Sequence, residues 1–413
     1  MRIAVQCTCG KVMQVDTRFA GTTRTCIFCR KNYRVPGMDD AAMSGTILDG
    51  EHNAVVATMH QRSESRPQWS NRYWWMILTM IPLIWMTFSP EETNFLDRIK
   101  EAKKDMTEKQ KAVVDKYEQA EGESGEGLSQ GEVRAIMHAL PDHKLPGALL
   151  TYDTTGHWIF ALLSGFIFLS LTVMLFPSRT TEPQNLGYVF LFTGTAGIML
   201  LLMFQFLAFA PIPIAPVGIF ILIVFCIKLI GFSYLAAMSP EYGFFASLLG
   251  FTFGVGLCEE LCKMLPVLWH YKRKSALDWR GACAWGLASG IGFGVSEGIS
   301  YSSDFYNGFL SGDIYWVRFM SCVALHAVWA ASAGISMWKN QDKLSGAETI
   351  YDLAFNIIAI LFVPMLLHGA YDTVLKKDME IAAVLIALLS FAWMAWTIED
   401  AKKHEVSKDE PLQ

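Results

Sequence analysis

Four apolar stretches of this chain contain side chains that ionise. The stretches read GLCEELCKMLPVLW, GIGFGVSEGIS, CVALHAVWAAS and FVPMLLHGAYDTVL, and their ionisable residues are Glu259, Glu260, Lys263, Glu297, His326, His368 and Asp372. A charged residue at the centre of a bilayer costs about 2.5 to 3.5 kcal/mol. One such residue could be an accident, or a polar contact between helices. Four successive segments with carboxylates and imidazoles predict one buried polar site.

The spacing of these residues indicates how they could pair. Lys263 follows Glu259 by four residues and Glu260 by three, so on a helix the lysine can reach back to either carboxylate. One glutamate would then be held by the lysine while the other is free to act. The i,i+4 spacing of His368 and Asp372 similarly lets the carboxylate orient the imidazole.

The composition predicts the kind of protein that carries this site. The 413 residues are 52% hydrophobic and 18% charged, which is too apolar for an average soluble protein. We therefore predict an all-α polytopic membrane protein with eight to nine transmembrane helices, a small N-terminal zinc-ribbon β module and a helical soluble insert. The strong spans are predicted at 157–176, 187–210, 214–238, 243–269, 281–302, 316–338, 350–375 and 380–398.

The predicted domains follow from shifts in composition along the chain. They are a zinc ribbon (1–36), a flexible linker (37–72), a short membrane segment (73–88), a soluble helical insert (89–156), a polytopic membrane domain (157–398) and a C-terminal tail (399–413). In the insert, FLDRIKEAKKDMTEKQKAVVDKYEQA predicts one charged helix. Ser129 and Glu132 predict a capping box that opens a second helix ending before Pro141. We interpret His138, His143 and His157 as ordinary surface histidines.

The first cysteines form a metal-ligand pattern. Cys7 and Cys9, followed by Cys26 and Cys29, provide two close pairs of thiolates that can close a tetrahedral zinc site. Four ligands leave no open position, so the zinc would be structural or would support binding of a protein partner. Two disulfides, or a ribbon that no longer binds metal, are the alternatives. The remaining cysteines are predicted to be inert thiols: Cys226, Cys258, Cys262, Cys283 and Cys322.

The orientation in the membrane stays open. The loops HYKRKSALDWR and KNQDK and the segment AKKHEVSK are basic and would face the cytoplasm, where reduced thiolates are also favoured. If 73–88 spans the membrane, the cysteine module is placed outside. If 73–88 lies in the interface, the module stays inside.

The ordered motifs resemble a known family. Glu-Glu-x-x-Lys (Glu259, Glu260, Lys263), Phe-x-x-x-Glu (Phe293, Glu297), the lone His326 and His-x-x-x-Asp (His368, Asp372) resemble the PrsW family of intramembrane proteases. That family is similar to the CAAX prenyl endopeptidase superfamily. The resemblance covers about residues 240–375 and implies that 157–398 is a membrane protease domain, with those motif residues as its catalytic set.

The resemblance implies hydrolysis of a peptide bond by a glutamate-activated water. Glu259 or Glu260 is expected as the general base. A catalytic divalent metal could be bound by Glu297, His326 and His368, which would leave a fourth position for water. Alternatively, the two histidines donate hydrogen bonds to the oxyanion and no metal is needed. The residues fit both schemes, and we favour the metal-free one at this point.

Two other classes of function use similar residues. A proton-coupled transporter relies on intramembrane Glu, His and Asp, although we find no inverted repeat. A non-catalytic sensor or scaffold could recruit partners through the zinc ribbon. For a protease, the expected partners are the lipid bilayer and a membrane-anchored protein substrate, for which the family suggests an anti-sigma factor, and the expected location is the bacterial inner membrane. The net charge of −5 argues against a nucleic-acid partner.

Overall fold

The computed structural model describes most of the chain in two separate units. The described ranges are 2–6, 12–16, 21–26, 31–35, 73–89, 95–124, 129–178, 180–210, 219–272 and 277–409. The first unit runs from Met1 to Trp69 and the second from Ser70 to Gln413.

The first unit contains two short antiparallel hairpins. Strand β1 (Arg2–Gln6) pairs with β2 (Val12–Asp16), and β3 (Thr23–Thr25) pairs with β4 (Asn32–Arg34). Cys26 follows β3 directly and is buried. Cys7, Cys9, Cys29 and the whole linker predicted at 37–72 lie outside the described residues, so the zinc ribbon stays a prediction.

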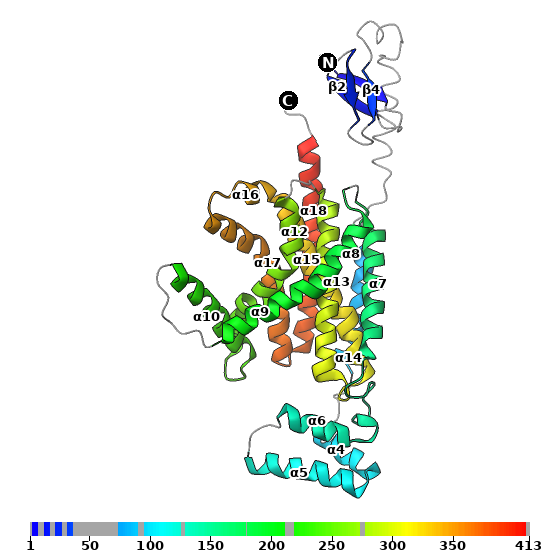
Figure 1. Cartoon of the computed structure of the whole chain (residues 1–413), viewed down its shortest axis with the longest axis vertical. Helices are drawn as coiled ribbons and strands as arrows, with labels where there is room; N and C mark the ends of the chain where they lie inside the picture. Colours follow the sequence, from blue (N-terminus) through cyan, green and yellow to red (C-terminus); the bar gives the residue numbers. More distant parts are fainter. Residues whose placement is uncertain are drawn as a thin grey trace. The chain divides into compact units, whose positions relative to one another are not determined.

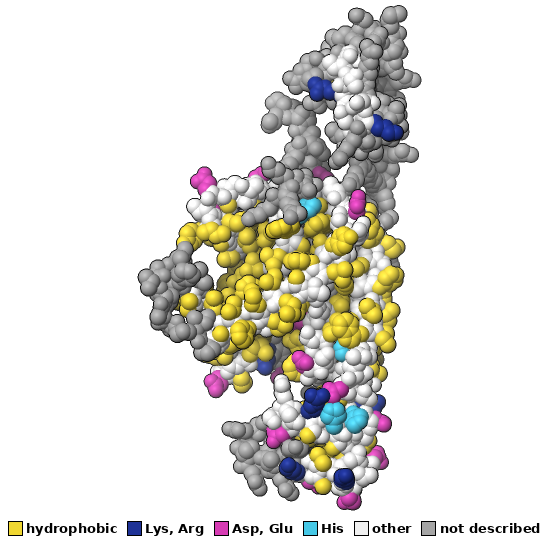
Figure 2. Space-filling model, viewed as in Figure 1, with side chains coloured by type: hydrophobic (Ala, Val, Ile, Leu, Met, Phe, Trp, Pro, Cys, Tyr) yellow, Lys and Arg dark blue, Asp and Glu magenta, His cyan; other side chains and the backbone are white. Residues whose placement is uncertain are grey.

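The second unit is a helical membrane domain with six helices long and apolar enough to cross a bilayer. They are His157–Leu175, Pro183–Phe209, Phe244–Tyr271, Gly312–Lys339, Ile350–Lys376 and Glu380–Glu405. Figure 2 shows hydrophobic side chains covering the bundle, while charged side chains gather in the soluble insert. The protein is therefore an integral, multi-pass membrane protein. Six of the eight strong spans predicted from the sequence are such candidates in the part of the chain that the structure describes.

Two predicted spans account for this difference. The segment 214–238 contains α10 (Ile219–Met238), of which only Val224–Met238 is a described apolar stretch. The segment 281–302 forms α13 (Trp279–Tyr301), whose glycines and serines make it less apolar than the six candidates. Because α13 packs against α15, α8 and α7, it is shielded by protein and needs no lipid-facing surface (Figure 1).

The crossing helices are interrupted by turns of π-helix. The candidate spans consist of α7 (His157–Leu175), α8 (Pro183–Phe192) with α9 (Ile198–Phe209), α11 (Phe244–Gly250) with α12 (Leu257–Lys272), α14 (Gly312–Trp316) with α15 (Val323–Lys339), α17 (Ile350–Lys376) and α18 (Glu380–Asp409). The π-turns η6 (Thr193–Gly197), η7 (Phe251–Gly256) and η9 (Val317–Cys322) join the paired helices, and η8 (Ser302–Tyr306) follows α13. Such turns often occur at functional sites.

Glycines bring α13 and α15 into close contact. A Cβ atom added at Gly290 would clash with the carbonyl oxygen of His326, and one added at Gly286 would clash with that of Ala330. Small residues at a helix interface let two backbones approach closely in a membrane. These glycines therefore fix the helix that carries His326 against the helix that carries Glu297.

The short apolar segment 73–88 is part of the same bundle. It forms a 3₁₀ stretch, η3 (Tyr73–Met80), and then α3 (Ile81–Thr87). Met76, Met80 and Leu83 are buried in the main core. The Ser321 hydroxyl donates to the Thr79 carbonyl at 2.6 Å and accepts from the Leu83 N–H at 3.3 Å.

The segment predicted as an insert (89–156) is a small helical unit with its own core. It contains α4 (Phe95–Ala102), η4 (Lys103–Asp105), α5 (Glu108–Ser124), α6 (Gln130–Ala139) and η5 (Pro141–His143). The single charged helix predicted here was wrong, because the backbone is extended at Met106 (ψ 145°) and α4 and α5 are separate. This break lets Ile99 and Val114 reach one core with Ile136 of α6.

The capping box at the start of α6 is confirmed. Ser129 accepts from the Glu132 N–H at 3.4 Å, while the Ser129 N–H and hydroxyl donate to the Glu132 carboxylate at 2.8 and 2.7 Å. The bond from the Ser129 hydroxyl, followed by the one from its backbone, lowers the pKa of Glu132. The predicted end of α6 before Pro141 is also found.

The insert is attached to the loop between α13 and α14. The Leu145 N–H donates to the Gly308 carbonyl, and the Gly308 N–H donates to the Leu150 carbonyl, both at 2.8 Å. His157 lies beside this contact and is buried, with its Nδ1 3.0 Å from the Asn307 amide nitrogen. The interpretation of His157 as a surface residue was therefore wrong, because the residue begins α7 within this packed junction.

The structure also describes the five cysteines that were predicted to be inert and a lysine within an apolar helix. Of the thiols predicted to be inert and buried, Cys258, Cys262, Cys283 and Cys322 are buried, whereas Cys226 is exposed on the surface of α10. Lys228, a cation within α10, donates to the Ala210 carbonyl at 2.5 Å and so satisfies a backbone acceptor at the end of α9.

Candidate active site

The Glu-Glu-x-x-Lys motif lies on α12, directly after the π-turn η7. Lys263 is fully buried, and its Nζ lies 2.8 Å from Glu260 Oε1 and 3.4 Å from Glu259 Oε2. The pairing expected from the i,i+3 and i,i+4 spacing is therefore found. The ammonium also lies 4.6 Å from the centroid of the Phe293 ring, which offers the cation a second favourable contact.

The His-x-x-x-Asp motif lies on α17 and faces α12. His368 Nδ1 is 3.0 Å from Glu260 Oε1, and its Nε2 is 3.6 Å from Glu259 Oε2 and 3.4 Å from Asp372 Oδ2. The imidazole stacks on the Trp329 ring with the centroids 4.4 Å apart. Contacts on both ring nitrogens and on one ring face hold His368 in a defined orientation.

His326 comes from α15 and reaches the same place from another direction. Its Nε2 lies 2.8 Å from Glu297 Oε2 on α13, and its Nδ1 lies 4.0 Å from Glu259 Oε2. Helices α12, α13, α15 and α17 therefore bring all seven predicted site residues into one cluster. The prediction of a single buried polar site is met by the geometry.

Sequence reasoning missed two residues that contact this cluster. Arg318 lies on the π-turn η9, and its Nη2 is 2.8 Å from Glu297 Oε1. The same rule that singled out Glu297, a charge within an apolar segment, could have found Arg318 in the predicted span 316–338. Trp329 is the other, and nothing in the sequence distinguishes it from an ordinary core tryptophan.

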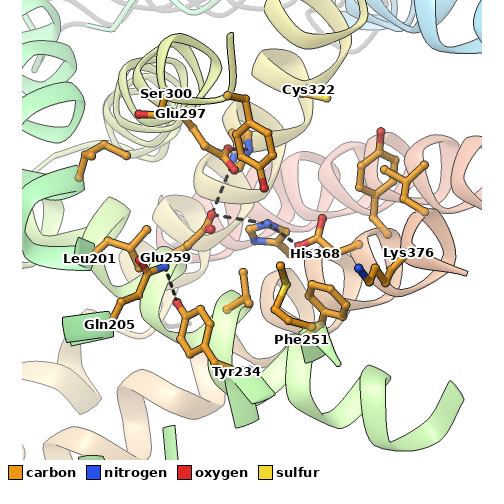
Figure 3. Close-up of a pocket in the computed structure, with 18 of the residues that line it drawn as sticks. Leu201, Gln205, Tyr234, Phe251, Glu259, Glu297, Ser300, Cys322, His368 and Lys376 are labelled. Atoms are coloured by element: carbon orange, nitrogen blue, oxygen red, sulfur yellow. Dashed lines mark hydrogen bonds and ion pairs between the residues drawn. The ribbon is translucent and has the colours of Figure 1, made fainter. Parts of the chain in front are cut away.

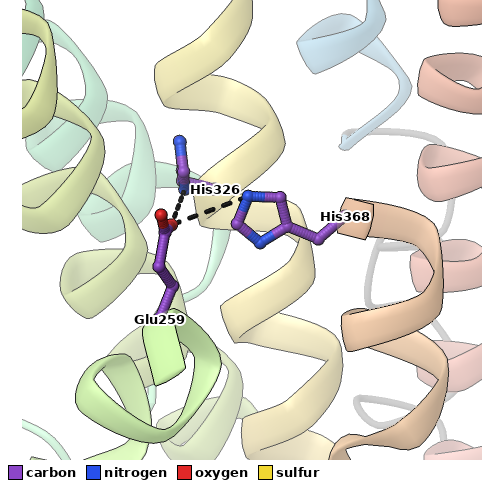
Figure 4. Close-up of side chains that lie close together, drawn as sticks. All are labelled: Glu259, His326 and His368. Atoms are coloured by element: carbon purple, nitrogen blue, oxygen red, sulfur yellow. Dashed lines mark ion pairs between the residues drawn. The ribbon is translucent and has the colours of Figure 1, made fainter. Parts of the chain in front are cut away.

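Three of these side chains form a group that could bind a metal ion. Ligand atoms of Glu259, His326 and His368 all lie within 4.8 Å of one another, and all three residues are buried (Figure 4). His326 Nδ1 is buried without a hydrogen-bond partner. This donor set therefore fits a divalent ion such as zinc. The carboxylate of the group is Glu259, whereas the ligand set expected from the sequence contained Glu297.

The other nitrogen of each imidazole is held by a carboxylate. Glu260 lies at Nδ1 of His368, and Glu297 lies at Nε2 of His326. Metal-binding histidines commonly donate their second N–H to a carboxylate, which fixes the tautomer and the orientation of the ring. The arrangement thus leaves His368 Nε2 and His326 Nδ1 directed toward Glu259.

A cavity of about 620 Å³ opens onto the cluster. Figure 3 shows Glu259, Glu297 and His368 directed toward one another, with Tyr234 and Gln205 nearby. Asp372 also lines the cavity, and its side chain is 26% exposed. Glu260 and Lys263 are not part of the described lining. Among the carboxylates of α12, Glu259 is therefore the one that a molecule in the cavity can reach.

Comparison with known proteins agrees with this arrangement. Residues 215–397 match the family described as PrsW family intramembrane metalloproteases. No curated protein and no solved structure matches the chain. The matched range includes every residue of the cluster, and the transporter and scaffold alternatives gain no support from it. Residues 215–397 are therefore a PrsW family intramembrane metalloprotease domain, and the protein is a peptide hydrolase.

Proposed function

We propose that this protein cleaves a peptide bond of a membrane-anchored protein substrate at the Glu259–His326–His368 group. One observation carries the proposal. Two imidazoles, each held at one nitrogen by a carboxylate, converge on a third carboxylate at the wall of a cavity within the membrane domain. This is the arrangement that a hydrolytic metal site needs, because it combines rigid ligands with space for water and substrate.

Glu259 through an Oε atom, His326 through Nδ1 and His368 through Nε2 would hold the metal. A bound divalent ion supplies Lewis-acid chemistry, which polarises a carbonyl group and makes water easier to deprotonate. A deprotonated water adds to the peptide carbonyl carbon, and the C–N bond then breaks as the amine leaves with a proton. The chain must therefore supply a group that accepts a proton and later returns it.

Asp372 is our candidate for this proton transfer. Its carboxylate is the most exposed among the four acids of the cluster, and it lies at the cavity, 3.4 Å from His368 Nε2. Glu260 is held by Lys263 and His368 behind the cavity wall, so it positions His368 and does not act on water. This assignment differs from the expectation that Glu259 or Glu260 is the general base.

The metal-free scheme has less support than the sequence alone suggested. In that scheme both histidines donate to the oxyanion and Glu259 or Glu260 activates water. The family is described as one of metalloproteases, and the unpartnered Nδ1 of His326 is directed at Glu259 as a ligand atom would be. Measuring the metal in the purified protein distinguishes the two schemes.

We propose that the first unit recruits a protein partner or regulates proteolysis. Two hairpins and a buried Cys26 are compatible with a structural zinc site made by Cys7, Cys9, Cys26 and Cys29. Its partner would be a protein, and an anti-sigma factor remains one expectation for the substrate.

The test compares the N-termini that proteolysis creates in cells that express either the full chain or a variant of it. When the parent protein is expressed, we expect new N-termini on membrane proteins, detected by labelling and mass spectrometry. They should be absent with Glu259→Gln and with His326→Ala. Purified protein in which the four ribbon cysteines are replaced by serine should retain about one bound zinc, and His326→Ala should lose it.

The matched controls make the same kinds of substitution at positions away from the cavity. Glu380→Gln changes a glutamate at the start of α18, and His138→Ala changes a partly exposed histidine of the insert. Both should leave the new N-termini unchanged. If Glu259→Gln and His326→Ala produce the same N-termini as the parent, this group is not the hydrolytic site.

A further inference from the structure

Arg318 is a cation buried within the membrane domain, where charged residues are rare and usually functional. Its side chain is 12% exposed and lies on the π-turn η9, which precedes α15. The guanidinium carbon is 4.1 Å from the centroid of the Tyr301 ring, and Nη2 is 2.8 Å from Glu297 Oε1. Burying such a group is costly unless it is paired, so its pairing partner indicates its role.

Glu297 connects Arg318 to the proposed metal site. Its Oε1 is paired with Arg318, and its Oε2 lies 2.8 Å from His326 Nε2. A buried carboxylate stays charged only where a cation or several donors compensate the lost hydration. Arg318 supplies that cation beside Glu297, and the 2.8 Å distance places the carboxylate where it can take the N–H of His326 Nε2. With the hydrogen at Nε2, the lone pair of Nδ1 is free and directed toward Glu259.

The turn that carries Arg318 is held from two sides. The Ser321 hydroxyl donates to the Thr79 carbonyl at 2.6 Å, and the Ser164 hydroxyl donates to the Phe319 carbonyl at 2.5 Å. A π-turn leaves backbone carbonyls without their usual helical partners, and the Ser164 hydroxyl satisfies one such carbonyl in η9. The Ser321 hydroxyl of the same turn ties it to the Thr79 carbonyl of η3. The guanidinium is therefore carried by a turn of fixed position.

We propose that Arg318 is a positioning residue of the protease, which acts through Glu297 to make His326 present Nδ1 to the metal. This inference rests on the proposed function, since it assigns a role to Arg318 within that site. It also adds the segment 73–88, through Thr79 and Ser321, to the parts of the chain on which the geometry of the site depends.

The test measures metal affinity and does not rely on proteolysis alone. The full chain with the four ribbon cysteines replaced by serine is titrated with Co²⁺, and binding is followed by its visible absorption. We expect Arg318→Met to weaken binding by about 10- to 100-fold, as losses around ligating histidines commonly do. Arg318→Lys, which keeps one charge but not the planar fork, should recover part of the affinity.

A double variant shows whether Arg318 acts through Glu297. Arg318→Met should weaken binding much less in a Glu297→Gln background, because the carboxylate that transmits its effect is then absent. An equal loss in both backgrounds, or parental affinity of Arg318→Met alone, would overturn the inference. If Arg318→Met does not fold, Arg318→Lys compared in the parent and Glu297→Gln backgrounds gives the same comparison.

Arg280 provides a matched control. It also pairs with a glutamate, Glu405 at 3.3 Å, and its guanidinium carbon lies 4.4 Å from the centroid of the Trp279 ring. Arg280→Met should leave Co²⁺ affinity unchanged. His326→Ala separates the two levels of the argument. If His326→Ala binds Co²⁺ with the parental affinity, the proposed metal site is wrong. If His326→Ala loses Co²⁺ binding and Arg318→Met does not, only the proposed role of Arg318 is wrong.

Discussion

At the scale of single residues, each charge of the buried cluster has a defined partner. Lys263 is fully buried between Glu260 and Glu259, and Arg318 neutralises Glu297. Breaking a buried ion pair by removing one partner typically costs about 3 to 5 kcal/mol, because an unpaired charge is left behind. The site therefore depends on residues that never touch the substrate.

Lys263→Met tests this dependence. The change leaves Glu260 buried without its cation while His368 still needs that carboxylate, so we expect a loss of about 3 to 5 kcal/mol in stability and loss of proteolysis. Adding Glu260→Gln should restore most of the stability but not the activity, since a neutral amide orients His368 less well. Thermal unfolding in detergent and the appearance of new N-termini measure the two effects.

The chain offers a matched control for this change. Lys402 and Glu399 form a pair with the same i,i+3 spacing and the same 2.8 Å distance, but their side chains are 26% and 46% exposed. Exposed pairs contribute about 0 to 1 kcal/mol, so Lys402→Met should have little effect. Equal losses for Lys263→Met and Lys402→Met would mean that burial of the charge is not the cause.

At the scale of helices, the sequence predicts which residues pair within one helix, but not which residues of different helices come into contact. The spacing of Glu259, Glu260 and Lys263 was sufficient to predict their contacts, because a helix fixes neighbours at i+3 and i+4. The contacts of Glu260 with His368 and of Glu297 with Arg318 depend on how separate helices are rotated. The π-turns η7 and η9 change that rotation just before Glu259 and His326, and no local sequence signal predicts them.

Gly290→Ala tests how closely α13 and α15 must pack. The added Cβ would clash with the His326 carbonyl oxygen and lie 2.6 Å from Ala327 Cα. Because the obstacle is backbone, α15 must move, and overpacking of this kind costs about 1 to 3 kcal/mol. We expect a lower unfolding temperature and a strong loss of proteolysis. Gly187→Ala on α8, where an added Cβ would meet nothing within 4 Å, should change neither.

At the scale of the whole membrane unit, the insert is coupled to the site through one loop. Residues 307–311 join α13, which carries Glu297, to the helix that carries Arg318 and His326. Backbone hydrogen bonds tie this loop to the insert, with Leu149 N–H donating to the Leu310 carbonyl at 3.0 Å in addition to the two at Gly308. The insert lies outside the range that matches the family, whereas the loop lies within it.

Gly308→Val tests that coupling. Gly308 has a φ of 83°, and an added Cβ would lie 2.6 Å from Met137 Cε and 3.0 Å from Tyr152 Cβ, both in the insert. We expect the insert to detach from the loop, with faster hydrogen exchange at 145–150 and 303–311 and slower proteolysis. Gly147→Val is the control, because Gly147 has a similar φ of 84° but its added Cβ would meet only Arg98 Nη2 at 3.8 Å. It carries the same backbone strain without the clash at the loop. If Gly308→Val increases exchange in the loop and proteolysis continues at the parental rate, the insert does not act on the site.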